Sequence, residues 1–367
     1  MKLVFSKSDL NKAVGIVMKA VPTRTTMNIL ECILIDATTN VIKFTGNDME
    51  LGIETIVEGE IIEKGKVAID AKLFSEIVRK LPDSEITITT DANYTSLITC
   101  EKSKFNIAGK SGDDFSYLPI IEKDKMITIS QFNLREVINQ TIFSTAPNDN
   151  NKMMTGELFE VSDNVLKVEG LDGHRIEIRN FKLEGRADDV KEVVPGKTLQ
   201  EISKILSTDA ENMVNVYFTN NHILFEFDNT TVVSRLIEGE YFKINQMLSS
   251  DYGTKVVINK KEFFASIDRA NLLIKEGEKK PIIINITDGS LEVNVNSAIG
   301  TLNEDIDIEK EGKDLMIGFN PKFLLDALRV IDDETVDIYL VNPKAPCFIR
   351  DKEQSYIYLI LPVNFTA

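Results

Sequence analysis

The chain has 367 residues, of which 43% are hydrophobic, and a formal net charge of −16. A chain of this length is too long to fold around one ordinary hydrophobic core, so we expect two or three domains. The longest apolar run, residues 356–363, is far shorter than the ~20 residues that span a bilayer, so we expect no membrane helix. The acidic balance argues against nucleic acid as a partner unless the positive residues gather on one surface.

Cysteine and histidine usage narrows the class further. Cys32, Cys100 and Cys347 are odd in number and widely spaced, which argues against a disulfide framework or a paired-cysteine metal site. With only His174 and His222, a histidine-based metal centre is not expected. The sequence therefore predicts a cytoplasmic protein with no cofactor and no metal.

In chain order, the first repeated pattern is a short strand followed by an amphipathic helix, at residues 5–20, 129–143 and 258–274. Each helix has two apolar residues four positions apart, which places them on one buried stripe. These pairs are Leu10 and Val14, Leu134 and Ile138, and Phe263 and Ile267.

A second set of helices recurs at residues 70–82, 196–207 and 320–331. Their opening lysines, Lys72, Lys197 and Lys322, are separated by 125 residues each time. A polar turn and an alternating strand such as residues 86–89 follow, which indicates sheets with one buried face.

The repeats predict an α+β protein of three similar domains, each with two helices and two small antiparallel sheets. We expect domain boundaries at 1–121, 126–249 and 254–367, with links near 119–125 and 249–254.

The six expected helices together carry a net positive charge, so the rest of the chain is more acidic than its total of −16 suggests. Two interpretations stay open. The helix cations either form one surface for a phosphate backbone or lie on ordinary solvated faces. A protein surface that binds the phosphate backbone would do so regardless of base sequence, because no base-reading motif accompanies the helix cations.

Near the middle of the chain, Leu171-Asp172-Gly173-His174-Arg175-Ile176 follows a strand-like segment. Asp172 and His174 admit an acid–base pair, since alternate residues of a strand share a face. No nucleophile elbow or phosphate-binding glycine loop supports an enzyme. The glycine equally fits a tight turn in a binding surface.

These landmarks, with Gly239-Glu240-Tyr241-Phe242, the helix that opens at Asn320-Pro321-Lys322-Phe323, and the final apolar run, resemble the bacterial sliding clamp family, the beta subunit of DNA polymerase III. The resemblance runs from end to end. It implies a head-to-tail homodimer whose six domains form a ring, with twelve helices lining the hole and sheets continuing across domain boundaries. Such a ring encircles duplex DNA without sequence specificity and tethers the replicative polymerase for processive synthesis, without catalysis of its own.

The same resemblance implies three sets of site residues. For DNA contact the matching positions are Arg24, Lys72 and Lys197, and the positive charge of the helices adds Arg79, Lys80 and Lys204. For the dimer interface they are Lys102, Lys104, Phe105 and Ile107 on one subunit and Leu272, Leu273, Glu304 and Asp305 on the other. For an apolar groove that binds partner peptides they are Met154, Leu171, Gly173, His174, Arg175, Ile176, Phe242, Gln246, Met247, Asn320, Phe323, Leu359, Leu361, Pro362 and Val363.

Through this groove the resemblance implies docking of the DNA polymerase III catalytic subunit, the clamp loader, other polymerases and repair proteins. Phe242 and Gln246 differ from the proline and arginine common in the family.

Simpler alternatives are a solvent-exposed loop for Arg24 and plain core positions for Phe105 and Leu273. A peptide-binding scaffold that never encircles DNA is the alternative function, but it leaves the positive helices unexplained.

Overall fold

The computed structural model describes residues 1–248, 251–275 and 280–365. The chain packs as two compact units. Unit 1 comprises residues 1–135, 184–188 and 198–236, and unit 2 comprises 136–183, 189–197 and 237–367. The boundary between the two units falls inside the expected second domain, 126–249. Some strands of that domain continue the sheet of the first expected domain, and the others continue the sheet of the third. Part of the expected link at 249–254, residues 249–250, lies outside the described residues.

Unit 1 contains one antiparallel sheet of 13 described strands, in the order β10-β15-β16-β17-β4-β3-β2-β6-β9-β8-β7-β1-β5. The strands are β1 (Lys2–Phe5), β2 (Cys32–Asp36), β3 (Ile42–Asn47), β4 (Leu51–Val57), β5 (Glu60–Glu63), β6 (Lys66–Asp70), β7 (Ile86–Thr90), β8 (Thr95–Cys100), β9 (Ser103–Ser111), β10 (Lys125–Ser130), β15 (Met213–Phe218), β16 (His222–Phe227) and β17 (Thr230–Arg235). The β4–β17 pair joins the first expected domain to the second.

Unit 2 contains 12 described strands in the order β14-β11-β12-β13-β25-β24-β23-β18-β21-β20-β19-β22. They are β11 (Gly156–Ser162), β12 (Val165–Leu171), β13 (Arg175–Lys182), β14 (Val190–Pro195), β18 (Thr254–Asn259), β19 (Ile282–Thr287), β20 (Ser290–Ser297), β21 (Gly300–Gly312), β22 (Leu315–Phe319), β23 (Thr335–Leu340), β24 (Cys347–Arg350) and β25 (Tyr356–Ile360). The β13–β25 pair joins the second expected domain to the third. Sheets that continue across both boundaries were predicted and are confirmed.

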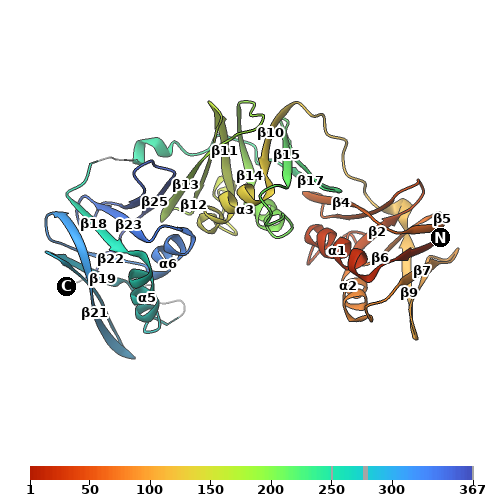
Figure 1. Ribbon diagram of the computed structural model, residues 1–367, viewed down its shortest axis with the longest axis horizontal. Coiled ribbons are helices and arrows are strands. Elements are labelled where there is room, and N and C mark those ends of the chain that lie inside the picture. Colours follow the sequence, from red (N-terminus) through yellow and green to blue (C-terminus); the bar gives the residue numbers. More distant parts are fainter. Residues whose placement is uncertain (249–250, 276–279, 366–367) are drawn as a thin grey trace. The chain divides into compact units, whose positions relative to one another are not determined.

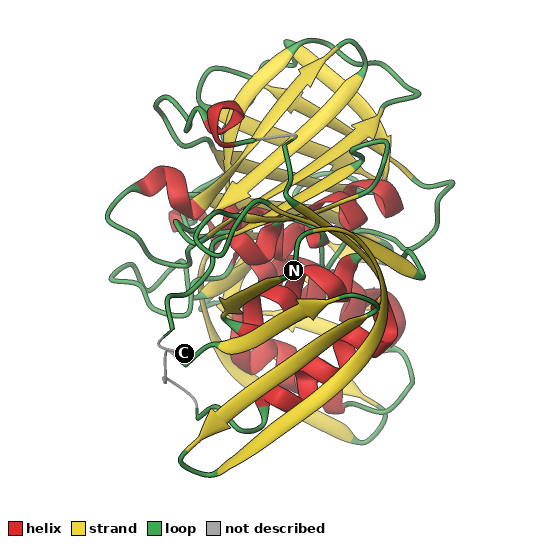
Figure 2. Ribbon diagram, turned by 90° about the vertical axis from the view of Figure 1, so that its left-hand side faces the viewer, coloured by secondary structure: helices red, strands yellow, loops and turns green. Residues whose placement is uncertain are grey.

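Six α-helices occur in the described residues, two per expected domain. They are α1 (Lys7–Val17), α2 (Ala71–Lys80), α3 (Gln131–Asn139), α4 (Gly196–Ile202), α5 (Lys260–Asn271) and α6 (Pro321–Val330). In unit 1, α1 and α2 lie side by side against the sheet, and α5 and α6 do so in unit 2 (Figure 1). Figure 2 shows the helices gathered against one face of the curved sheets.

Local sequence explains where these helices begin. The side chain of Asp70 accepts the main-chain N–H of Leu73 at 2.8 Å and caps α2, whose last turn carries Arg79 and Lys80. Both features favour a helix, because the acceptor satisfies a free N–H and the cations lie at the negative end of the helix dipole. Helix α6 is capped by Asn320 and opens with Pro321.

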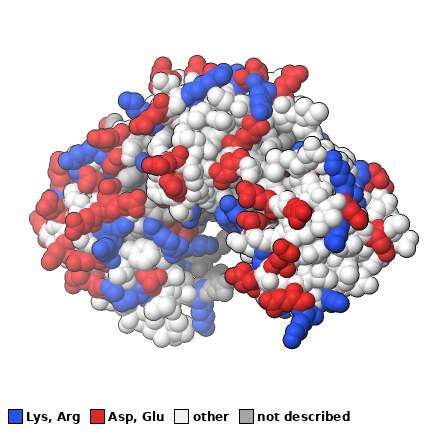
Figure 3. Space-filling view, turned by 45° about the vertical axis from the view of Figure 1, so that its right-hand side comes forward, with Lys and Arg blue, Asp and Glu red and all other residues white. Residues whose placement is uncertain are grey.

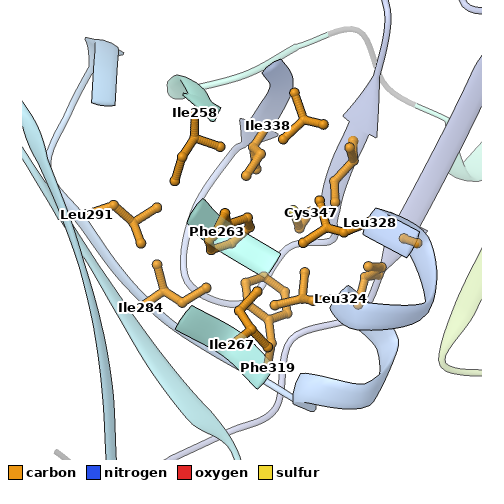
Figure 4. Close-up of a cluster of buried hydrophobic side chains, with 14 of the residues drawn as sticks. Ile258, Phe263, Ile267, Ile284, Leu291, Phe319, Leu324, Leu328, Ile338 and Cys347 are labelled. Carbon is orange, nitrogen blue, oxygen red and sulfur yellow. The ribbon is translucent and has the colours of Figure 1, made fainter. Parts of the chain in front are cut away.

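The apolar stripes of the helices face the sheets. In the third expected domain, Phe263 and Ile267 of α5 and Leu324 and Leu328 of α6 are at most 1% exposed. They pack together with strand residues such as Ile284 (Figure 4). This packing confirms the stripe predicted from Phe263 and Ile267.

Candidate functional site

The Asp172–His174 segment is a tight turn that joins β12 to β13. Gly173 has φ +83°, a left-handed conformation that glycine adopts without strain. One carboxylate oxygen of Asp172 accepts the main-chain N–H groups of His174 at 3.0 Å and Arg175 at 3.2 Å. The segment is therefore a hairpin turn closed by its own aspartate.

Arg175 anchors this turn. Its side chain is only 5% exposed, and its guanidinium lies 3.0 Å from the carboxylate of Asp172 and 2.9 Å from that of Asp326 on α6. It also donates to the main-chain carbonyl of Phe143 and lies 4.6 Å from the ring centre of Phe323. A buried arginine needs this set of partners, because an unpaired guanidinium away from water is strongly destabilising.

The Asp172–His174 acid–base interpretation does not fit this geometry. The two residues lie in the turn, and the other carboxylate oxygen of Asp172 accepts from Arg175 Nε at 3.0 Å. The imidazole of His174 stacks on Phe323, with 5.9 Å between ring centres. The carboxylate of Asp172 is thus occupied by hydrogen bonds within the turn and to Arg175, and the ring of His174 packs on the ring of Phe323.

Apolar residues from several segments of unit 2 meet beside the turn. They form one hydrophobic cluster that includes Leu171, Ile176, Leu359, Met154, Phe242, Leu361, Ile178, Ile244, Phe348, Ile357, Tyr241, Leu248 and Tyr339. The first six of these were predicted for the peptide groove. The main-chain N–H of Leu361 donates to the carbonyl of His174 at 2.9 Å, which fixes the final apolar run against the turn.

Other predicted groove residues lie at the margins of this cluster. Met247 is 50% exposed and follows the exposed Gln246 on a single 3₁₀ turn, Ile244–Met247. Pro362 and Val363 are half-buried, and the N–H of Val363 donates to the carbonyl of Gly318 at 2.8 Å. The side chain of Asn320 accepts the N–H of Lys322 at 3.1 Å, so its observed role is the cap of α6.

Two buried carboxyl groups near this cluster were not predicted. Glu157 on β11 and Glu177 on β13 are fully buried, and their carboxylate oxygens make no hydrogen bond to any described residue. Burial raises the pKa of Glu157 to about 8. Burial also raises the pKa of Glu177 well above its usual range, although Arg175 opposes the shift. Both groups are thus held in the protonated form over a wide pH range.

The predicted DNA-contacting cations all have exposed side chains. Lys72, Arg79 and Lys80 share the exposed side of α2, and Arg24 lies in the loop after α1. This position of Arg24 is compatible both with phosphate contact and with the simpler loop interpretation. On the face seen in Figure 3, acidic side chains are widespread between smaller groups of Lys and Arg.

The cations of α4 are less uniform. Lys204 pairs with Glu201 at 2.7 Å, and its side chain lies just beyond the end of α4 at Ile202. Lys197 is exposed in the first turn of the same helix and also has a partner. Lys204 must exchange its intrachain partner to contact a phosphate.

Two long strands have an open edge within the described residues. Strand β9 pairs with β8 over residues 103–108 and with β6 over 109–111. Strand β21 pairs with β20 over 300–307 and with β18 over 308–312. The second edge of each strand is therefore unpaired along residues 103–107 and 300–307 of the described chain, which leaves backbone groups available to another strand.

The predicted dimer residues lie on or beside these edges. Phe105 is 39% exposed, so the core interpretation is wrong for it, whereas Leu273 is partly buried against the core of the third expected domain. Leu272 is 76% exposed at the end of α5. Glu304 pairs with Arg269 of α5, and Asp305 accepts from Ser290 at 3.2 Å. Lys102, Lys104 and Ile107 lie in or just before β9.

No group of three or more His, Cys, Asp or Glu side chains suited to a metal ion occurs among the described residues. Within the same residues, no helix is both long and apolar enough to traverse a bilayer.

Family models for the DNA polymerase III beta subunit match the chain in order. The N-terminal domain model matches residues 1–119, the central domain model 128–243 and the C-terminal domain model 245–364. The chain belongs to the DNA polymerase III beta subunit family. Its fold is the family's three repeated α+β clamp domains, as the sequence repeats predicted.

Individual members of the family are similar to this chain in sequence and in structure. The beta sliding clamp of Staphylococcus aureus is 35% identical over 358 residues, which are 95% of each chain. A DNA polymerase sliding clamp from Bacillus subtilis is similar in structure, with a TM-score of 0.94 and 33% identity over 100% of both chains. A candidate DNA polymerase III beta subunit from Eubacterium rectale has a TM-score of 0.96 and 68% identity, again over 100% of both.

Several residues that shape the candidate peptide surface were not predicted from the sequence. Asp326 and Phe143 hold Arg175, and Tyr241 donates to the main-chain carbonyl of Glu169 at 3.0 Å. Tyr241 was inside a recognised segment and could have been included. The Arg175–Asp326 pair spans 151 positions, and no local pattern indicates such a contact.

Proposed function

We propose that two copies of this chain close head to tail into a ring that encircles duplex DNA and tethers the replicative DNA polymerase to it. The observation that carries the proposal is the match of three consecutive beta subunit domains along almost the entire chain. In this role the chain acts in the cytoplasm, binds no cofactor and contributes no catalytic step. We retain 1–121, 126–249 and 254–367 as its domains.

The two open strand edges support the head-to-tail contact. Lys104 and the exposed Phe105 lie on the open part of β9, whereas Glu304 and Asp305 lie on the open part of β21. Pairing β9 of one subunit with β21 of the next satisfies both edges and brings opposite charges together. Because the two surfaces differ, the contact is heterologous and produces a closed ring only at the correct rotation.

The exposed cations support contact with the DNA backbone. Lys72, Arg79 and Lys80 are exposed on α2, and Arg24 is exposed in the loop after α1. Lys197 in the first turn of α4 and Lys204 just beyond its end lie 125 residues after Lys72 and Arg79. Lysine and arginine without base-reading side chains bind phosphates in a sequence-independent manner, which suits a ring that must slide.

The apolar cluster beside the Asp172–His174 turn supports partner docking. Leu171, Ile176 and Leu359 form its buried base, Leu361 is half-buried beside them, and Met247 lies exposed at its margin. A short peptide gains affinity from a few such anchors plus polar groups that orient it. We propose that the DNA polymerase III catalytic subunit, the clamp loader, other polymerases and repair proteins bind here through short motifs.

Retention on closed circular DNA tests the ring directly. A ring loaded by its clamp loader should survive a high-salt wash on an intact circle and be released when the circle is cut. A peptide-binding scaffold that does not encircle DNA should wash off both forms at the same rate.

A further inference from the structure

The chain builds the same junction twice, once in each unit. In unit 1, Asp48 accepts the N–H groups of Glu50 at 3.0 Å and Leu51 at 2.6 Å, and Met49 has φ +76°. The N–H of Arg235 then donates to the carbonyl of Glu50 at 3.0 Å. In unit 2 the same three features occur at Asp172, Gly173 and the Leu361–His174 bond.

Side chains distinguish the two junctions at the position after the turn. The residue at this position is Leu51 in unit 1 and Arg175 in unit 2. Each pairs with a residue of the neighbouring strand, Leu51 with Ser234 and Arg175 with Ile360. Leu51 is a neutral buried residue at 1% exposure and needs no charged partner. Arg175 is also buried and requires carboxylates from elsewhere in the chain.

The helices at the two junctions also differ in whether their side chains contact the turn. The 125-residue period aligns Thr198 and Glu201 with Phe323 and Asp326. Thr198 bonds to Ser234 at 2.7 Å, and Glu201 pairs with Lys204 of its own helix segment. In contrast, Phe323 stacks on both His174 and Arg175, and Asp326 reaches Arg175 across the junction. Helix α6 thus contacts the Asp172–His174 turn through two side chains, Phe323 and Asp326, which are neighbours on the helix surface.

We propose that Asp326 is a positioning residue for partner-peptide binding. Through Arg175 it holds the turn against Phe323 and presents the exposed imidazole of His174 to the peptide. The Arg175–Asp326 pair makes the junction in unit 2, and not its counterpart in unit 1, the peptide-binding one. This inference rests on the proposed function, because it assigns the peptide surface to the cluster beside the turn.

The test compares Asp326→Asn with its counterpart in the other junction, Glu201→Gln. Affinity is measured with a fluorescein-labelled peptide that carries a glutamine- and leucine-bearing partner motif. Asp326→Asn should weaken the peptide about 10-fold, since the buried guanidinium then keeps only Asp172 as a countercharge and the turn shifts. Glu201→Gln should bind as the wild type does. Dimer assembly is measured on all proteins and should remain unchanged. The thermal midpoint should fall for Asp326→Asn and not for Glu201→Gln, because Arg175 is buried.

A conservative variant separates positioning from folding. Asp326→Glu retains the charge and therefore the fold, but its longer side chain displaces the guanidinium, so binding should still weaken roughly threefold. Wild-type affinity in both Asp326 variants would overturn the inference. If those variants bind normally while Leu361→Ala weakens the peptide, the inference alone fails. If Leu361→Ala also has no effect, the proposed peptide surface fails with it.

Discussion

The main-chain N–H of Leu361 donates to the carbonyl of His174 at 2.9 Å, which ties the end of the chain to a turn 187 positions earlier. Through this bond the final apolar run and the β12–β13 turn form one surface of unit 2. Leu361 and Leu171 belong to the same hydrophobic cluster as a result. The peptide surface therefore depends on the C-terminal segment as well as on the turn.

Truncation of apolar side chains on this surface should weaken partner peptides. Leu361→Ala and Met247→Ala each remove an apolar anchor, so we expect a loss of ~1–3 kcal/mol in peptide binding, measured by isothermal titration calorimetry. Met213→Ala is the matched control, because Met213 is 47% exposed on β15 of unit 1. Equal losses in the control and the test variants would show that the effect is not local to this surface.

Phe105→Ala should shift the dimer toward monomers. The ring of Phe105 is 39% exposed on the open part of β9, where it can be buried by a second copy. Sedimentation velocity over a concentration series would measure the dissociation constant, which should rise at least tenfold. Ile62→Ala, at a 48% exposed position on β5, should leave it unchanged. An unaltered constant for Phe105→Ala would place the interface elsewhere.

Replacement of the cations on α2 should reduce the salt dependence of DNA binding. If Lys72 and Arg79 each bind one phosphate, Lys72→Ala or Arg79→Ala should lower the slope of log affinity against log salt by ~0.9. Fluorescence anisotropy with a short duplex, over a salt series, gives this slope. Lys352→Ala alters an exposed loop cation and serves as the control. A slope that does not change in the α2 variants would favour ordinary solvated helix faces.

Stability should fall with rising pH because of Glu157. Its pKa is about 8 in the folded chain and near 4.5 when unfolded, so between these values only the folded state holds the proton. Rising pH across that interval therefore disfavours folding, by an amount on the order of a few kcal/mol at pH 8 and above. Glu157→Gln should flatten the decline in thermal midpoint between pH 5 and 8.5, and the exposed Glu353→Gln should not. Identical declines in all three proteins would contradict the buried-carboxyl account.

The repeated helices could be predicted because their apolar stripes are local patterns. Lys72, Lys197 and Lys322 each fall in the first turn of a helix, as expected. The end of α4 was predicted less well, since residues after Ile202 continue as turns instead of α-helix. The N–H of Ile205 bonds to the carbonyl of Ile202, three residues back, at 3.0 Å, and no glycine or proline marks that change.

The candidate site was predictable in its apolar part and not in its charged part. Leu171, Ile176, Leu359 and Leu361 come from segments that the family resemblance identified, and the structure brings them together. The partner of Arg175 could not be found in the same way, because several acids on helices have the same local context as Asp326. Only the packing of α6 on the β12–β13 turn selects one of them.

The most direct test of the central claim is retention on DNA of defined topology. Protein labelled at an added surface cysteine is loaded by its clamp loader on a nicked circular duplex, washed in high salt on a sizing column, and then treated with a restriction enzyme that cuts the circle once. A closed ring should keep the label on the circle through the wash and release it after the cut. Loss of the label from the intact circle at the rate seen with linear DNA would contradict encirclement.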